Sequence, residues 1–192
     1  MTKIRRPKSL LPFIIASLLP VLSSAPSAHA QDLVLSVVID GPLTGGVPKA
    51  IELYAINDIA DLSAYGVASA NNGSPSAGAP EFVFPAVAVS AGSYIYVATE
   101  SPNFLAFFGF DPDFNSDAAS INGDDAIELY EGSTVIDVFG EVGVDGSGQP
   151  WEYLDGWAYR NSETGPDGTV FSLASWTFSG INALDGETSN AT

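Results

Sequence analysis

The stretch best suited to chemistry is DPDFNSDAASINGDD, which gathers acidic and amide side chains in one short segment. Oxygen ligands at alternate positions are typical of a calcium-binding loop, because this spacing directs several of them at one ion. Calcium takes about six to eight oxygens, so some ligands must come from the end of the segment. The sequence therefore offers calcium as a candidate ligand, held by Asp111, Asp113, Asn115, Asp117, Asp124 and Asp125.

This segment departs from the EF-hand, in which a glycine makes the sharp turn and a glutamate binds calcium through both of its oxygens. Ser116 stands at the position of that glycine, and Asn122 stands at the position of that glutamate. A turn after Asn122 would instead bring Asp124 and Asp125 back toward the ion. The alternative interpretation is a solvated acidic loop whose side chains form turns and cap helices.

Aromatic side chains near the C-terminal end form the second candidate site, because all 3 tryptophans lie in the last quarter of the chain. A two-residue turn after Leu154 would pair 151–154 with 157–160 in a tight hairpin, and would place Trp151 beside Arg160 for a cation–π contact. We expect Arg160 also to have an acidic structural partner. An exposed platform would bind carbohydrate, whereas the alternative is ordinary core packing. The candidate ligand-facing aromatics are Trp151, Trp157 and Tyr159.

The pentapeptide AIELY occurs twice, at Ala50–Tyr54 and at Ala126–Tyr130. In a strand, the isoleucine and leucine of each copy point to one side, and the glutamate and tyrosine point to the other. A second apolar run follows each copy, so we expect two hairpins that contribute their apolar faces to a shared core. Glu52 and Glu128 would make a glycosidase-like carboxylate pair if they met. The alternation by itself predicts that both are exposed and solvated.

Two absences limit the chemistry that this chain can perform. The only histidine, His29, lies in the N-terminal segment, and the chain has no cysteine. The rest of the chain therefore has no Ser-His-Asp or Cys-His site and no nitrogen or sulfur ligand of the kind that zinc prefers. The glycine-rich stretches GPLTGGVPK and VGVDGSGQPW lack the Gly-Lys-Ser/Thr ending of a phosphate-binding loop. We expect a protein that is not an enzyme and requires no cofactor.

Residues 1–30 have the features of an export signal, with a basic start, an apolar run over Leu10–Leu22 and the small-x-small sequence Ala28-His29-Ala30. We expect cleavage after Ala30 and a product that is secreted to the extracellular space or the periplasm. The apolar run is too short, and too interrupted by proline, to span a bilayer. No membrane span is therefore expected once the signal is removed.

The remainder of the chain is strongly acidic. Lys49 and Arg160 are its only cations against all 23 acidic residues, which gives a formal net charge of −21 for residues 31–192. Such a surface repels phosphate backbones, and nucleic-acid binding needs clustered lysine and arginine. We therefore expect no direct binding to nucleic acid.

Short apolar runs separated by glycine, proline, asparagine and aspartate predict an antiparallel β protein. One segment, SPNFLAFFGF, predicts a short helix over residues 102–108, with Ser101 as its cap and Gly109 at its end. We expect one domain over 31–184, a mobile surface loop over Ser69–Pro80 and a flexible tail over 185–192. The expected strands are Leu33–Ile39, Ala50–Tyr54, Ser63–Val67, Phe82–Phe84, Tyr94–Ala98, Ala126–Tyr130, Val135–Phe139, Trp151–Leu154, Trp157–Arg160 and Leu173–Phe178.

Several segments carry a resemblance to a known family. KAIELYAINDIADLSAYGV resembles the opening hairpin of the lamin tail domain, and INGDDAIELYEGSTVIDVFGEVG is similar to its central hairpin. AVSAGSYIYVA looks like the family strand that is entered through an Ala-Gly turn, and WEYLDGWAYR, TGPDGT and WTFSGINALDG look like closing segments of bacterial secreted members. The resemblance implies an all-β, Ig-like β-sandwich. It also implies a family whose bacterial members are commonly exported and often attached to hydrolases, with no catalytic motif of its own.

We therefore expect a secreted, non-enzymatic, lamin-tail-like module with an interaction or structural role, whose partner is a protein or a polysaccharide. Calcium would stabilise it if the acidic segment binds the ion. One alternative is an accessory or targeting domain of an extracellular nuclease or phosphatase system. A second alternative is a carbohydrate-binding module.

Overall fold

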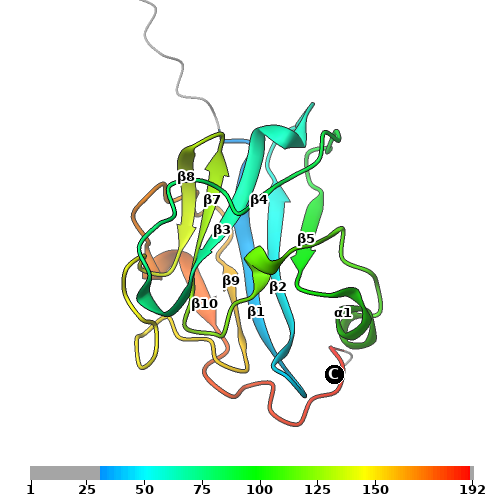
Figure 1. The fold of residues 1–192 in the computed structure, drawn as a ribbon, viewed down its shortest axis with the longest axis vertical. Coiled ribbons are helices and arrows are strands. Elements are labelled where there is room, and N and C mark those ends of the chain that lie inside the picture. The colour runs from blue at the N-terminus through cyan, green and yellow to red at the C-terminus, as the bar shows by residue number, and fades with distance from the viewer. Residues whose placement is uncertain (1–30, 191–192) are drawn as a thin grey trace, which may run out of the picture. The chain divides into compact units, whose positions relative to one another are not determined.

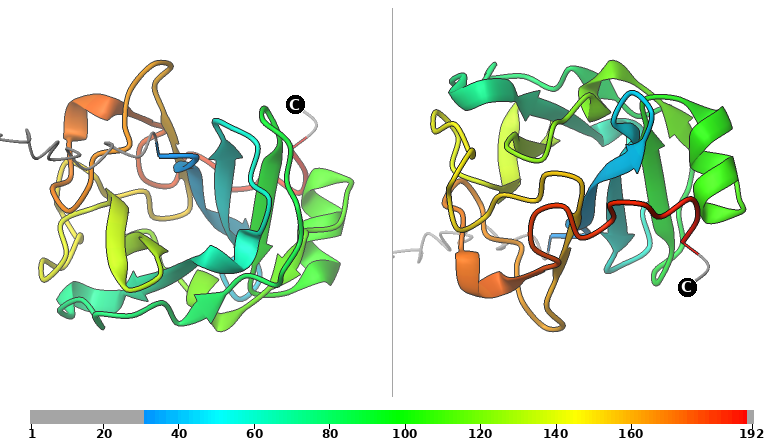
Figure 2. Two further views of the ribbon diagram at one scale, coloured as in Figure 1. Left: turned by 90° about the horizontal axis from the view of Figure 1, so that it is seen from above. Right: turned by 90° about the horizontal axis from the view of Figure 1, so that it is seen from below.

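The computed structural model describes residues 31–190, and the expected signal segment lies outside the described residues. The described chain forms two β-sheets packed face to face, with one short α-helix (Figure 1). Seen from above and below, the two sheets form separate layers (Figure 2). The expected all-β sandwich is therefore confirmed.

The first sheet has six strands in the order β10-β9-β1-β2-β5-β6. All its pairs are antiparallel except β5 with β6, and α1 supplies the crossover that this parallel pair requires. Two of its strands, β5 and β9, have the bounds that the sequence predicts. The strands are β1 (Leu33–Leu43), β2 (Val47–Ala55), β5 (Tyr94–Ala98), β6 (Phe114–Asn115), β9 (Trp157–Arg160) and β10 (Trp176–Phe178).

The second sheet has four antiparallel strands in the order β4-β3-β7-β8. Within the described residues it is joined to the first sheet by connections and not by strand pairing. Its strands are β3 (Tyr65–Ala70), β4 (Phe82–Val83), β7 (Ala126–Glu131) and β8 (Thr134–Phe139).

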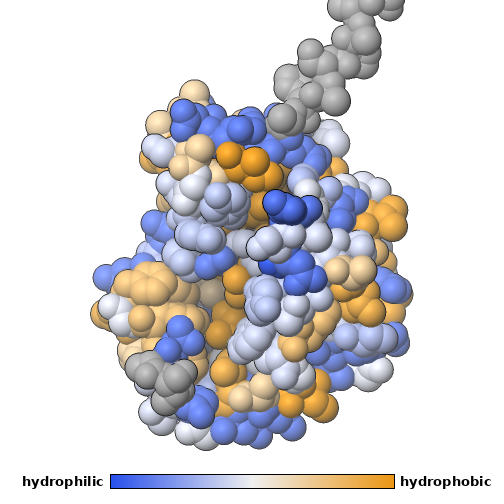
Figure 3. Space-filling model, turned by 180° about the vertical axis from the view of Figure 1, so that it is seen from behind, coloured by the Kyte–Doolittle hydropathy of each residue, from blue (hydrophilic) through white to orange (hydrophobic). Residues whose placement is uncertain are grey.

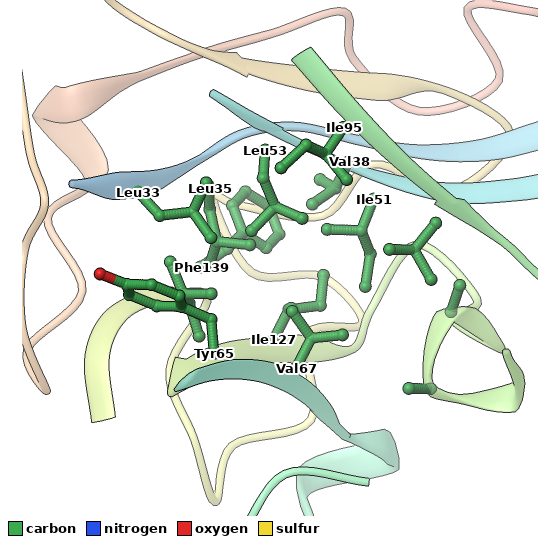
Figure 4. Close-up of a cluster of buried hydrophobic side chains, with 14 of the residues drawn as sticks. Leu33, Leu35, Val38, Ile51, Leu53, Tyr65, Val67, Ile95, Ile127 and Phe139 are labelled. Carbon is green, nitrogen blue, oxygen red and sulfur yellow. The ribbon is translucent and has the colours of Figure 1, made fainter. Parts of the chain in front are cut away.

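The main hydrophobic core fills the space between the two sheets (Figure 4). The isoleucine and leucine of both AIELY copies are fully buried there, as the alternation predicts. Burying side chains of this size stabilises the fold by roughly 1.5–3 kcal/mol each. The four residues are Ile51, Leu53, Ile127 and Leu129.

The two AIELY copies lie in opposite sheets, the first in β2 and the second in β7. The second copy begins the expected hairpin, because β7 pairs with β8. The hairpin expected for the first copy is wrong, since β2 pairs with β1 and β5, whereas β3 pairs with β4 and β7. Between β2 and β3, Ile59 and Leu62 are buried in the core and carry the chain across to the other sheet.

The helix α1 (Ser101–Phe108) confirms the predicted helical segment. Its cap is Glu100 and not the expected Ser101, because the Glu100 carboxylate accepts a hydrogen bond of 2.9 Å from the backbone N–H of Asn103. Gly109 ends the helix, as predicted, and it adopts the left-handed conformation. Short 3-10 helices occupy Leu62–Ala64, Asn71–Gly73, Asp117–Ala119 and Leu173–Ser175, two of them in place of strand residues expected from the sequence.

The expected strand over Trp151–Leu154 and its hairpin with β9 are wrong. Both edges of β9 are already paired, one with β1 and the other with β10. Trp151 and Tyr153 instead turn into the core, where they are almost completely buried. Burial of these large rings therefore decides the path of this segment, which forms turns and not a strand.

Both cations of the described chain are ion-paired within the fold. Arg160 of β9 contacts Asp137 of β8 at 2.7 Å and Asp167 at 2.9 Å, and its side chain is 4% exposed. Lys49 of β2 contacts Asp40 of β1 at 2.6 Å, and it also donates to the side chain of Asn122 before β7. Arg160 therefore links the six-stranded sheet to β8 of the four-stranded sheet, and Lys49 links it to the segment that leads into β7. The acidic partner expected for Arg160 is confirmed.

The loop after β3 and the C-terminal segment both contact the body of the domain. The Ser76 hydroxyl lies 3.0 Å from the Tyr130 hydroxyl, so the loop covers part of β7. The backbone N–H of Asn190 donates a 2.8 Å hydrogen bond to the carbonyl of Phe107 in α1. The sequence predicts only a mobile loop and a flexible tail for these two segments.

Candidate functional site

A hydrophobic groove on the outer face of the six-stranded sheet is the candidate site, because apolar and aromatic side chains line it together with one acid. We call it the aromatic groove, and its volume is about 280 Å³. Val37 and Ile39 of β1 and Ala50 of β2 form its floor. The face that carries it is turned away from the viewer in Figure 1, and Figure 3 shows hydrophobic atoms gathered in a hollow there.

Aromatic rings from two distant parts of the chain form the walls of the groove. Phe104 and Phe108 of α1 stand on one side, with ring centroids 4.6 Å apart. Trp157 and Tyr159 of β9 stand on the other side, stacked at 5.4 Å with their planes 21° apart. Tyr159 is 43% exposed, so its ring is available to a ligand. The walls therefore offer several aromatic surfaces to one occupant.

A β-bulge in β1 shapes the centre of this face. The pairing of β1 with β2 shifts between Leu35 and Val37, so two successive side chains point away from the core. Val37 enters the floor of the groove. The hydroxyl of Ser36 donates a 2.7 Å hydrogen bond to the carboxylate of Glu52. The bulge thus supplies both an apolar surface and a partner for the acid.

Among residues 31–190, Glu52 is the only charged side chain that lines the aromatic groove. It is half-buried and lies opposite Tyr96 of β5 in the sheet register. Burial raises the pKa of the Glu52 carboxyl, and hydrogen bonding from Ser36 and Tyr96 partly opposes that rise. Burial also raises the pKa of the Tyr96 hydroxyl, and the nearby Glu52 charge adds to that rise. Glu52 has no ion pair within residues 31–190.

The helix α1 is held in place by a second hydrophobic cluster outside the main core. Phe104 and Phe107 are buried against Ile39, Ala50 and Ala98 on the outer face of the sheet. This burial explains why β1 contains a continuous apolar run, since such a strand is covered on both faces. The cluster fixes the distance between α1 and β9, and therefore the width of the groove.

A second hollow lies farther along the same sheet face. Tyr54 and Tyr94 line it, with ring centroids 5.1 Å apart, and Tyr94 is 54% exposed. Its volume is about 560 Å³, and Ser36 also lines it. Because Ser36 contacts Glu52 of the aromatic groove, the two hollows are neighbours on one face.

The structure separates the three aromatics that the sequence proposes as ligand-facing. Trp157 and Tyr159 line the aromatic groove. Trp151 is 1% exposed and belongs to the core, so its role as a ligand-facing residue is wrong. The expected contact between Trp151 and Arg160 is also wrong, because the Arg160 guanidinium lies over the ring of Trp176, 4.5 Å from its centroid.

The two glutamates of the AIELY repeats do not form a pair. The neighbours of Glu52 and Glu128 in β2 and β7 point into the shared core, so the two glutamates lie on opposite outer faces of the sandwich. The sequence predicts that Glu128 is exposed and solvated, and this is wrong, because its side chain is buried and the residue is only 5% exposed. Its carboxylate accepts a 2.7 Å hydrogen bond from the Tyr130 hydroxyl. A paired-carboxylate mechanism has no geometric basis here.

The six proposed calcium ligands occupy different local structures. Asn115 belongs to β6 and accepts a hydrogen bond from Ser101, while the Asp113 carboxylate accepts one from the backbone N–H of Tyr96. Asp111 is exposed, and Asp117 begins a 3-10 helix. Asp124 accepts from Ser147, and the buried Asp125 accepts from the backbone N–H groups of Asn72 and Asn122. Within residues 31–190, no three histidine, cysteine or acidic side chains are grouped so as to hold a metal ion. Calcium binding by these residues stays a prediction.

Most of the groove residues were missed by reasoning from the sequence. The alternation in the sequence predicts Glu52 as an exposed strand residue, and the sequence predicts the phenylalanines of α1 only as part of a short helix. Two signals pointed toward them. The run Val37-Val38-Ile39 breaks the alternation expected of a strand with one exposed face, and α1 has more aromatic residues than one buried helix face needs.

Comparisons of this chain with protein-family models, with curated proteins and with solved structures find no match. The resemblance to the lamin tail domain therefore stays a prediction. No helix within residues 31–190 is long and apolar enough to cross a membrane.

Proposed function

We propose that this domain is a non-enzymatic binding module whose ligand occupies the aromatic groove. The observation that carries this proposal is the groove itself, which has an apolar floor, aromatic walls from α1 and β9, and a single carboxylate. Ligand sites in proteins are mostly apolar hollows with a few polar groups that fix orientation. The proposal agrees with the interaction role expected from the sequence.

The size of the groove limits the ligand. Its volume of about 280 Å³ lies near the lower end of the range typical of small-molecule sites. The occupant is therefore a small molecule or a single chemical group. We also propose, from the sequence, that the protein is exported after cleavage at Ala30 and that it belongs to the lamin tail family. N-terminal sequencing of the mature protein tests the cleavage.

The test uses the fluorescence of Trp157, because Trp151 and Trp176 are buried in the core and Trp157 is half-buried in the groove wall. A library of small soluble compounds is screened for changes in emission that saturate with concentration. A Tyr159→Ala variant should bind every hit more weakly, since Tyr159 forms the exposed part of the wall. The matched control is Tyr94→Ala, which removes another exposed tyrosine, 54% against 43% for Tyr159, from the same sheet face outside the groove. Equal affinity in wild type and Tyr159→Ala would contradict the proposal.

A second candidate function is polysaccharide binding, which the row of exposed rings along one sheet face favours. Tyr159 in the aromatic groove and Tyr94 in the neighbouring hollow could each stack on a sugar ring of one extended chain. In that case both Tyr159→Ala and Tyr94→Ala should weaken binding to a soluble polysaccharide. Loss in Tyr159→Ala alone would favour the small-ligand site.

A further inference from the structure

Glu52 is a half-buried acid that has no cationic partner within residues 31–190. The described chain contains only two cations, and both Lys49 and Arg160 are held in ion pairs away from the groove. The hydrogen bonds that Glu52 receives come from neutral hydroxyl groups. A carboxylate that loses water without gaining a positive partner is costly to keep charged. A cation bound in the groove beside Glu52 would therefore stabilise the charged form of this carboxylate.

The walls of the groove suit the same kind of ligand. The faces of tryptophan, tyrosine and phenylalanine rings attract cations, and they do so more strongly when water is excluded. Such rings stand on both sides of the groove, on α1 and on β9. The net charge of −21 for residues 31–192 adds a long-range attraction for cations and repels anions. The aromatic walls and the overall negative charge thus both favour a cationic ligand.

We propose that the aromatic groove binds a small organic cation, an alkylammonium ion whose charged head contacts Glu52 and whose apolar chain lies between α1 and β9. This inference rests on the proposed function and names its ligand class. We assign a free small molecule as the occupant, because a groove of about 280 Å³ has room for a whole alkylammonium ion. Within the groove, Glu52 gives charge recognition, and Trp157 and Tyr159 give contact area.

The experiment compares hexylammonium with 1-hexanol, which has the same chain length and no charge, by calorimetric titration at low salt. We expect the ammonium ion to bind roughly ten- to a hundredfold more tightly, as a hydrogen bond to a charged group would give. Glu52→Gln should remove this preference while leaving the affinity for 1-hexanol unchanged. The matched control, Glu163→Gln, removes the same charge from the rim of the neighbouring hollow and should keep the preference.

A pH titration of the wild-type protein tests the same idea without a substitution. The groups that can titrate in the groove are Glu52 of β2, Tyr96 of β5 and Tyr159 of β9, while α1 contributes only phenyl rings. Burial raises the pKa of the Tyr96 hydroxyl, so that group stays neutral in acid, and the affinity for hexylammonium should fall as Glu52 takes up a proton. The affinity for 1-hexanol should not change. A preference for the ammonium ion that survives acidification would overturn the assignment to Glu52.

Each other outcome also decides between the proposals. Equal binding of hexylammonium and 1-hexanol would overturn the cation inference and leave the binding module standing. A preference that is lost in Glu163→Gln as well would reflect general surface charge and would also overturn it. Binding of a lysine-containing peptide without binding of hexylammonium would show that the occupant is a protein side chain. If neither the peptide nor the two small molecules bind, the cation inference falls, and the compound screen decides separately on the proposed function.

Discussion

Replacing Arg160 with methionine should destabilise the domain strongly, because it leaves a buried acid without its cation. The substitution removes four hydrogen bonds, two to Asp137, one to Asp167 and one to the carbonyl of Leu35. Asp137 is completely buried, but the backbone N–H groups of Leu35, Val138 and Asp167 still donate to it. We therefore expect a loss of about 3 kcal/mol, at the lower end of the range for a broken buried ion pair. A domain of this size should melt roughly 6–12 °C lower.

The effect should depend on pH in a defined direction. Burial raises the pKa of the Asp137 carboxyl, and the charge of Arg160 is the strongest opposing influence. Without Arg160 the pKa of Asp137 rises further, so the variant is penalised most at neutral pH, where the unfolded chain ionises freely. As the pH falls through the raised pKa, the folded variant takes up a proton and the penalty declines. The deficit of Arg160→Met relative to wild type should therefore shrink on acidification.

Urea denaturation followed by circular dichroism measures this deficit at several pH values. A double variant, Arg160→Met with Asp137→Leu, should recover part of the stability, because it removes the unpaired acid as well. Glu141→Gln, on the exposed surface, should change stability by less than about 0.5 kcal/mol. A loss below about 1 kcal/mol in Arg160→Met, or a deficit that stays constant with pH, would refute this account of the ion pair.

Three further predictions concern the core, the covered face of β7 and calcium. Leu129→Ala should cost about 2–5 kcal/mol in urea denaturation, since Leu129 is fully buried between the sheets, and a smaller cost would mean that the core collapses around the gap. Tyr130→Phe should cost about 1 kcal/mol, because it removes the hydroxyl that donates to buried Glu128, and unchanged stability would show that this bond contributes nothing. If the acidic segment binds calcium, millimolar calcium should raise the melting temperature more than sodium of equal ionic strength, and Asp111→Ala with Asp113→Ala should abolish the difference. An equal effect of the two salts would leave the segment as a solvated loop.

Local patterns in the sequence predict that the isoleucine and leucine of each AIELY copy are buried in the core, and this is confirmed. The alternation of AIELY fixes the inward direction of Ile51 and Leu53 wherever the strand is placed, because side chains on a strand alternate with a period of two. Turn residues bound Tyr94–Ala98 and Trp157–Arg160 closely enough to give their ends correctly. Such features depend on neighbours in sequence, which is why they could be read without a structure.

Strand pairing and the groove depend on contacts between distant residues. The short link between β2 and β3 looks like a hairpin turn in the sequence, but burial of Leu62 carries the chain to the other sheet. The Asp155-Gly156 turn looked equally suitable for a hairpin, but β1 and β10 already occupy both edges of β9. The groove requires a bulge in β1 and the docking of α1 on that face. The apolar run Val37-Val38-Ile39 indicates that this face of β1 is covered, but no local pattern says which element covers it.

Because both cations are ion-paired and little exposed in the fold, the folded domain should resist trypsin. Between residues 31 and 192, trypsin can cleave only after Lys49 and Arg160, whose side chains are 12% and 4% exposed and lie within paired strands. Trypsin must bind such a side chain in an extended, accessible segment, which the folded domain does not provide. Each tryptic cut in this region therefore requires that a strand first leave its sheet. The rate of tryptic digestion should report directly how often the sandwich opens.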